Sequence, residues 1–453
     1  MEKLDAWIAA GAGYVWGPWL VILLAGTHLY LTWRTGLIQR HLGHAIRLSV
    51  SKEEGAQGDI SQFGALTTAL AATIGTGNIY GVAGAVLLGG PGAVLWMWLT
   101  GVFGIATKYS EALLSVKYRV VNERGQMSGG PMFVLQYALK ARWAGMIFAL
   151  FAALAAFGIG NMTQADAISG MVVANADVLP FTVAPETLKM SVGIFLAGMT
   201  ALVLLGGIRS IARVCSLLVP FMAALYVLGC LLVLALNWEV VPHTISLIFS
   251  SAFTGQAAVG GFVGAGIREA MRYGVARGLF SNESGLGSAP IVAAAARTKD
   301  PVRQALVSST GTFWDTVVIC ALTGLVLVGS GDWTAEGATK ASLCNQAFHS
   351  IGWLGDFILV GGLLTFVFST ILGWSYYGEK AVEYLVGVKA IMPYRVLWVA
   401  AVFLGSVWQS TTIWNFADMM NGLMAIPNLI AMLLLSGVIA SETKRYFDAR
   451  AQE

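Results

Sequence analysis

The sequence has few charged residues. Asp, Glu, Lys and Arg make up only 11% of its 453 residues, whereas 57% are hydrophobic. A soluble domain carries roughly 25% charged residues, so this chain cannot cover a surface that faces water. Its length leaves room for about ten or eleven membrane spans of roughly 20 residues each. The composition therefore predicts an all-α integral membrane protein that is surrounded by a lipid bilayer.

Cysteine is scarce too, and several enzyme motifs are absent. The four cysteines show no CxxC or CxxH spacing, which argues against a disulfide framework and a zinc site. There is no HExxH, GxSxG or Walker motif, and the five histidines lack ligand spacing, so a membrane enzyme is disfavoured. The net charge of +3 gives no indication of nucleic-acid binding, and we expect no nucleic-acid partner.

Eleven apolar segments are long enough to cross a membrane. Their approximate limits are 12–34, 63–89, 92–117, 144–174, 188–208, 213–237, 245–273, 304–330, 354–377, 394–412 and 421–441. The first segment is too long for the core of a signal peptide and has no clear cleavage site, so we expect a retained helix.

The basic residues support this count. When the loops are assigned alternately to two sides, one side receives all of the 27 Lys and Arg except Lys3, Lys189 and Lys340. Arg268, Arg272 and Arg277, at and just after the end of the segment 245–273, are counted with the majority. By the positive-inside rule the majority side is the cytoplasm. The C-terminus is then cytoplasmic and the N-terminus is outside.

The segment 63–89 contains a stretch that is a poor helix former, "TIGTGNI" at 73–79. Two glycines and two polar residues at mid-membrane indicate an unwound turn, which is tolerated only where it is buried in protein or lines a polar cavity. Free carbonyls there can bind a cation or an ammonium group, and the N–H groups of the following half-helix can bind a carboxylate. The alternative is close helix packing by small residues. A nucleotide loop is excluded, because Tyr80 stands where GxGxxG needs its third glycine.

A second glycine-rich stretch, "VGGFVGAG" at 259–266, lies inside the segment 245–273. Broken helices at corresponding places in two halves are typical of inverted-repeat transporters. We therefore expect an extra N-terminal helix and cytoplasmic linker (1–62), a first five-helix repeat (63–242), and a second five-helix repeat with the cytoplasmic C-terminus (243–453). In this 5+5 inverted-repeat core, the first helix of each repeat is broken.

The motifs of the chain resemble those of the alanine or glycine:cation symporter family. They are "TALAATIGTGNI" (68–79), "LGGPGAVLWMWLTGVFG" (88–104), "RGLFSNESGLGSAPI" (277–291), "LGWSYYGEK" (372–380) and "NGLMAIPNL" (421–429). Leu95 and Gly101 depart from the usual pattern. The resemblance implies the leucine-transporter-type fold of the amino acid–polyamine–organocation superfamily. It also implies sodium-coupled uptake of alanine or glycine across a prokaryotic inner membrane.

The resemblance implies a set of site residues. Substrate contacts are expected from Thr73, Gly75, Thr76, Gly77, Asn78, Ile79, Gln164 and Trp374. A co-transported sodium ion is expected between the carbonyls of Ala71 and Ile74 and the hydroxyls of Ser369 and Thr370, since hard cations prefer oxygen ligands. The alternative for the two hydroxyls is a hydrogen bond to their own helix, and for Trp374 a place at the membrane interface.

Four further residues and one loop are candidates. Asn161 lies one turn from Gln164 and either serves the site or bonds another helix. Asp315 is an intramembrane carboxylate, which holds a cation or a proton, or bonds neighbouring hydroxyls. Lys108 and Glu111 are three residues apart and are expected to form a pair. The loop 277–290 is expected on the cytoplasmic side as part of an inner gate.

Two alternatives to sodium symport stay open at this stage. Coupling to protons is one. A channel is the other, although two corresponding helix breaks favour alternating access over a filter loop. The sequence makes no prediction of oligomeric state.

Overall fold

The computed structural model describes residues 2–51, 53, 55–174, 183–254, 266–408 and 411–452. Helices dominate, as the composition predicts. A short antiparallel hairpin pairs β1 (Val120–Val121) with β2 (Met127–Ser128).

The helices of the first half follow the expected segments closely. They are α1 Glu2–Val15, α2 Pro18–Arg34, η1 Ile38–His41, α3 Leu42–Ser49, α4 Gln62–Thr73, η2 Gly77–Gly81, α5 Val82–Gly89, α6 Gly92–Lys117, α7 Pro131–Tyr137, α8 Arg142–Phe157, η3 Gly158–Met162, α9 Thr163–Ala174, α10 Pro185–Leu204 and α11 Gly207–Leu236.

The second half contains shorter connecting helices between the long ones. They are η5 Trp238–Val240, α12 Val241–Thr254, α13 Ile267–Asn282, α14 Pro290–Ala293, α15 Pro301–Thr312, η6 Phe313–Cys320, α16 Ala321–Gly329, η7 Asp332–Thr334, α17 Lys340–His349, α18 Trp353–Val386, η8 Val388–Ala390, α19 Ile391–Val407, α20 Thr411–Leu434 and α21 Ser436–Arg450.

The number of crossings is compatible with eleven. Within the described residues, eight helical segments are long and apolar enough to span a membrane, and the α4–α5 pair, bent by 54°, makes a ninth. Helix α6 has 26 residues, which corresponds to about 39 Å and is also long enough. A broken helix formed by α13 and α14 would bring the number of crossings to eleven.

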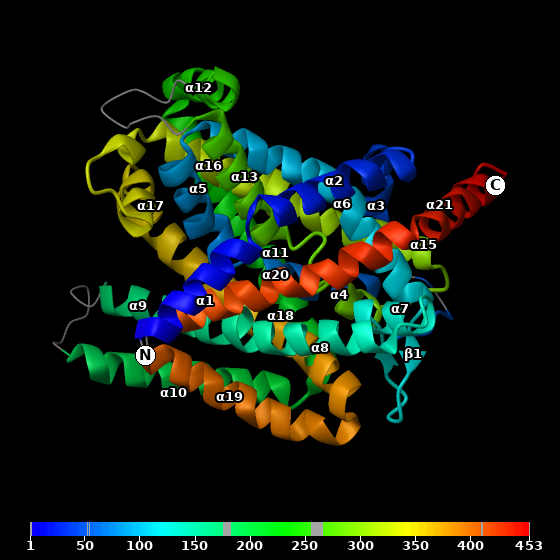
Figure 1. Ribbon diagram of the computed structural model, residues 1–453. Coiled ribbons are helices and arrows are strands. Elements are labelled where there is room, and N and C mark those ends of the chain that lie inside the picture. Colours follow the sequence, from blue (N-terminus) through cyan, green and yellow to red (C-terminus); the bar gives the residue numbers. More distant parts are fainter. Residues whose placement is uncertain are drawn as a thin grey trace.

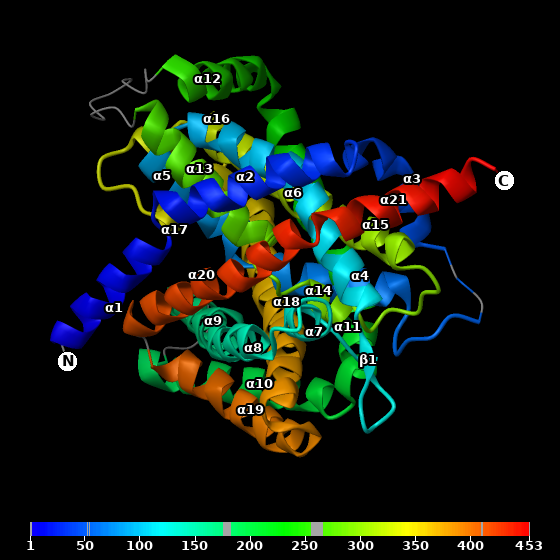
Figure 2. The same ribbon diagram turned by 45° about the vertical axis from the view of Figure 1, so that its right-hand side comes forward.

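The long helices run between two ends of the molecule. Figure 1 shows α8, α10, α19 and α20 extending in a common direction, with the N-terminus at one end and α21 at the other. Helix α18 packs against α4, α8 and α11, and α13 packs against α5 and α6 (Figure 2). The core is therefore built around α4, α6, α13 and α18, which carry the candidate site.

The predicted span 245–273 is wrong. Helix α12 ends at Thr254 and a separate helix, α13, begins at Ile267. The expected break at 259–266 lies almost entirely outside the described residues. The break in the second half lies instead at residues 283–289, between α13 and α14. Hydropathy missed α13 because it contains three arginines, and a helix surrounded largely by protein does not need an apolar sequence.

This correction concerns the three arginines of α13, which are Arg268, Arg272 and Arg277. Arg272 and Arg277 of α13 line a cavity of about 290 Å³ together with Ala9 and Ala12 of α1. They therefore lie at the N-terminal end of the molecule, and their assignment to the opposite side is wrong. The sorting failed here because a helix that begins at 267 reverses the path of the chain.

Thiol labelling tests the position of α13. All four native cysteines are buried, so the background reactivity of the folded protein is low. We expect a cysteine at the exposed position Arg272 to react with an impermeant maleimide from the same side as a cysteine at Ala9. A cysteine at Arg445, on α21, provides the opposite reference. Labelling of Arg272→Cys together with Arg445→Cys would contradict this path of the chain.

Candidate functional site

The first broken helix opens between α4 and η2. Ile74 has extended backbone angles (φ −77°, ψ 98°), and the chain resumes as a π-helical turn over Gly77–Gly81 before α5. The Gly75 N–H would bond the Ala71 carbonyl in a continuous helix, but it bonds Asn78 Oδ1 at 2.9 Å. The Ala71 carbonyl is thereby released from the helix ladder. The predicted unwound turn is confirmed.

Asp315 holds this turn in place. Asn78 Nδ2 donates to Asp315 Oδ1 at 2.7 Å and to Ser281 Oγ at 3.0 Å. Asp315 Oδ2 accepts from the hydroxyls of Ser281 and Thr316. The carboxylate is fully buried, and its partners come from the first break, from α13 and from η6. Of the alternatives for Asp315, bonding to neighbouring side chains is the one observed.

The predicted hydroxyl pair on α18 lies beside the first break. Ser369 Oγ is 3.3 Å from the Ala71 carbonyl oxygen, and Thr370 Oγ1 is 3.3 Å from the Ile74 carbonyl oxygen. A Cβ atom at Gly373 would lie 2.7 Å from the Ala72 nitrogen, so glycine is needed for α18 to approach the end of α4 this closely. Four neutral oxygens from two helices are thus brought together.

These oxygens form a ligand set suited to a hard monovalent cation. The described residues contain no group of three or more His, Cys, Asp or Glu that could hold a metal ion. The oxygens beside the first break are instead backbone carbonyls and hydroxyls, which are ligand types that hard cations accept.

Gln164 faces the same turn from α9. Its Nε2 donates to the Ile159 carbonyl at 2.9 Å, while its Oε1 is buried without a hydrogen-bond partner in the described part of the chain. That oxygen is 3.7 Å from the position of a Cβ atom on Gly75. Asn161, in contrast, donates to the Trp398 carbonyl of α19, which is the interhelical bond considered as its alternative role.

Trp374 connects α18 to the second break. Its Nε1 donates to Glu283 Oε1 at 3.0 Å, and its ring packs where Gly160 has no side chain. The ring is 1% exposed. Trp374 therefore lies in the interior of the protein, away from the membrane interface that was its alternative position.

The second helix break, between α13 and α14, was not predicted from the sequence. Residues 283–289 are buried, and Glu283, Gly285 and Gly287 all have positive φ angles. Glu111 Oε1 of α6 accepts the N–H groups of Gly285 and Gly287, both at 3.0 Å. That the segment 277–290 is part of an inner gate on the cytoplasmic side stays a prediction, but residues 277–282 belong to helix α13 and not to a loop. The spacing "SGLGS" beside an intramembrane glutamate was the available signal.

Glu111 does not pair with Lys108. Its Oε1 atom is used by the two glycine N–H groups and by Asn428 Nδ2 at 2.7 Å. Lys108 Nζ is buried without a hydrogen-bond partner among the described residues. The predicted pair fails because the backbone of the second break is a competing set of donors.

The side on which α4 begins is closed by backbone contacts. Residues Ile60 and Ala296 form a parallel bridge. Arg119 donates to the carbonyls of Ala294 (2.9 Å), Ala296 (2.7 Å), Gln57 (3.0 Å) and Thr298 (3.2 Å). One guanidinium therefore ties the linker before α4 to the segment after α14.

On the other side, Phe280 separates the first break from a cavity. Its ring lies 3.5 Å from the position of a Cβ atom on Gly77. It also lines the cavity of about 290 Å³ that holds Arg277, Asn415 and Asp418. The first break is thus covered from both sides in this conformation.

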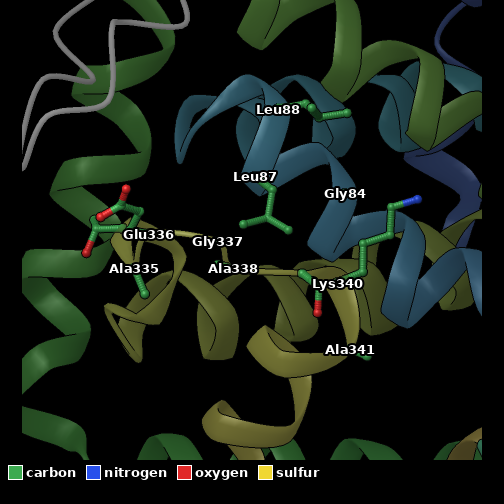
Figure 3. A pocket seen from close by; sticks show the side chains of 11 residues that line it. Gly84, Leu87, Leu88, Ala335, Glu336, Gly337, Ala338, Lys340 and Ala341 are labelled. Carbon is green, nitrogen blue, oxygen red and sulfur yellow. The ribbon is translucent and has the colours of Figure 1, made fainter.

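A cavity of about 1000 Å³ lies elsewhere. It is formed by α5 and the segment leading into α17. Figure 3 shows Lys340 extending beside Gly84, with Leu87 and Glu336 on other walls. None of the predicted site residues lines this cavity.

Comparison with known proteins identifies the family. The model of the sodium:alanine symporter family matches residues 1–453. The chain is 50% identical over 450 residues to the sodium/alanine symporter AgcS of Methanococcus maripaludis, covering 97% of this chain and 96% of that protein. It is 34% identical over 437 residues to the probable sodium/glutamine symporter GlnT of Bacillus subtilis, with coverage of 95% and 88%.

The fold has a solved counterpart. The crystal structure of MhsT in complex with L-phenylalanine superimposes with a TM-score of 0.59 at 14% identity, covering 84% of this chain and 90% of that one. The expected leucine-transporter-type fold is confirmed. The chain belongs to the sodium:alanine symporter family and is a sodium-coupled amino-acid symporter, not an enzyme.

Proposed function

We propose that this symporter binds its sodium ion between α4 and α18, at the carbonyls of Ala71 and Ile74 and the hydroxyls of Ser369 and Thr370. The observation that supports this site is that each hydroxyl lies near two carbonyl oxygens and can donate its single proton fully to only one of them. Ser369 Oγ is 2.8 Å and Thr370 Oγ1 is 3.0 Å from the Phe366 carbonyl of their own helix. Each hydroxyl has one proton, so a hydroxyl that donates to Phe366 turns lone pairs toward the break.

A bound cation would remove the repulsion between these oxygen atoms. Oxygen lone pairs that face one another at 3.3 Å repel unless a positive charge lies between them. Sodium would supply that charge without a change of helix position. It would also fix α18 against the end of α4, so that ion binding and closure of the site become one event.

The amino acid is proposed to bind in the first break, next to this ion. Its carboxylate would face the N–H groups that follow Gly75, at the positive end of the η2–α5 half-helix. Thr73, Thr76, Gly77 and Ile79 would line the space. Because the side chain of Asn78 is already bonded to Gly75 and Asp315, it would act by holding the turn.

Gln164 and Trp374 are proposed to bound the site on the α9 and α18 sides. The unpartnered Oε1 of Gln164 is an acceptor for the ammonium group, and a rotation of the amide by 180° would offer a donor to the carboxylate. The bulk of Trp374 and Phe280 around a turn of glycines favours a small substrate. We therefore propose alanine or glycine, in line with the name of the relative that is 50% identical.

The membrane and the orientation belong to the same proposal. A multi-pass chain of this family is proposed to lie in the inner membrane of a prokaryote. The majority of Lys and Arg would then face the cytoplasm, with the C-terminus on that side and the N-terminus outside. Arg119 would close the cytoplasmic entrance.

A gradient experiment tests sodium coupling. In proteoliposomes we expect alanine uptake to require an inward sodium gradient and to continue when the proton gradient is collapsed at constant membrane potential. Counterflow of labelled alanine gives the rate. Uptake that is equal in sodium-free buffer and follows the proton gradient would assign the coupling to protons.

Substitutions of the hydroxyls test the ion site. Ser369→Ala and Thr370→Val should each lower sodium affinity by about tenfold or more, since each removes one ligand to a charge. The control is Thr365→Val, one turn earlier on α18, whose hydroxyl bonds only its own helix at Gly361 and Gly362. The readout is the sodium concentration that gives half-maximal alanine binding. An equal shift in all three variants would contradict the site.

A pair of amide substitutions tests the substrate contact. Gln164→Ala should weaken alanine binding by about ten- to a hundredfold, because the loss of a hydrogen bond to a charged group costs roughly 1.5–3 kcal/mol. Asn161→Ala removes the bond to Trp398 and should lower the melting temperature instead. Binding isotherms and melting curves are measured on both proteins. An unchanged Kd for Gln164→Ala would remove this residue from the site.

A further inference from the structure

Lys108 is a buried cation without a bonded counter-charge. It lies near the middle of α6 and is 3% exposed, and its Nζ has no hydrogen-bond partner among the described residues. The other buried lysine in the described structure, Lys380, is bonded to Ser128 and Glu383 at 2.9 and 2.8 Å. Since an ammonium group carries three donors, Lys108 is far from satisfied.

The carboxylates near Lys108 accept hydrogen bonds from neutral donors, and only Oε2 of Glu111 has no partner among the described residues. Glu111 Oε1 binds the N–H groups of the second break, and Glu283 accepts from Trp374 and Ser288. Asp315 accepts from Asn78, Ser281 and Thr316. These three acids therefore act on Lys108 through their field, and none of the described carboxylates lies within 4.0 Å of its Nζ.

Lys108 lines a small cavity directly below the first break. The cavity has a volume of about 10 Å³, roughly the space of one water molecule. Its polar walls are Thr73 at the end of α4, Asn282 at the end of α13 and Ser308 on α15. The cavity thus lies between both breaks, on the side that Arg119 closes.

We propose that Lys108 forms an inner carboxylate subsite that receives the amino acid as it leaves the first break. This inference rests on the proposed function. Thr73 borders both the turn and the cavity, so a substrate that moves toward the α4 side brings its carboxylate to Lys108. An ammonium–carboxylate bond is charge-assisted and strong in a site without water.

The opening movement would enlarge this subsite. Its walls belong to α4, α6, α13 and α15, so a displacement of α4 away from α6 and α15 separates them. The field of Glu111, Glu283 and Asp315 weakens the hold on an anion. The subsite therefore binds the carboxylate transiently, which lowers the barrier to release without trapping the amino acid.

A monocarboxylate probe tests the subsite in the unmodified protein. Propionate lacks the ammonium group and is used as an inhibitor of sodium-dependent alanine exchange in oriented proteoliposomes. We expect inhibition when propionate is on the α4 side and at least about tenfold weaker inhibition from the other side. Equal inhibition from both sides, or none, would overturn the proposal.

Variants then assign the effect to Lys108. Lys108→Met should abolish the one-sided inhibition and slow alanine efflux by about tenfold or more, with alanine binding at equilibrium within about twofold. Lys108→Arg should retain the inhibition. Lys117→Met, at the exposed end of the same helix, is the control and should change neither. Normal efflux and inhibition in Lys108→Met would overturn the proposal. If the unmodified protein showed no sodium-driven uptake of alanine, the proposed function itself would be refuted.

Discussion

The structure depends on the need to satisfy backbone groups where no water is available. In a bilayer core an unpaired N–H or carbonyl costs several kcal/mol, yet two helices of this chain are interrupted there. At the first interruption the side chain of Asn78 replaces a lost carbonyl as the partner of Gly75. At the second, one carboxylate oxygen of Glu111 replaces two lost carbonyls as the acceptor for the N–H groups of Gly285 and Gly287. Each opening therefore needs a polar side chain buried beside it.

The polar side chains beside the two interruptions also bond to one another or to shared neighbours. Asp315 orients Asn78 and also bonds Ser281 near the end of α13, while Glu283 reaches Trp374 on α18. Short polar contacts thus connect the surroundings of the two interruptions. The hydroxyls of Ser369 and Thr370 lie on the same α18, so the proposed ion site is on the helix that contacts both interruptions.

Much of this could be predicted from the sequence, for identifiable reasons. The first break was found because glycines and polar residues interrupt an otherwise apolar segment, and most of the long helices were found because their sequences are apolar over about 20 residues. Helix α13 was missed because hydropathy measures contact with lipid, and this helix packs on α5 and α6. The pairing of Lys108 with Glu111 failed because sequence spacing does not reveal that the backbone of a distant segment competes for the same carboxylate.

Some site residues could likewise be predicted from the sequence, and others could not. Ala71, Ile74, Ser369 and Thr370 were predicted together and lie together, although whether they hold sodium is a proposal that binding measurements decide. The part played by Asp315 was left open because a carboxylate in an apolar segment can face any of several helices. Its partners became evident only when α13 and η6 were in place.

The contacts of Arg119 have a consequence for the evolution of this chain. The guanidinium binds four main-chain carbonyls and no carboxylate of the described residues, and every residue type presents the same carbonyl. The segments around Gln57 and Ala296 can therefore accept many side chains without a loss of the seal, provided that their backbone path is kept. The arginine has no such freedom, because only its planar fork reaches several acceptors at once. Sequence drift at this entrance should thus be tolerated on the acceptor side and restricted to a single residue type, arginine, on the donor side.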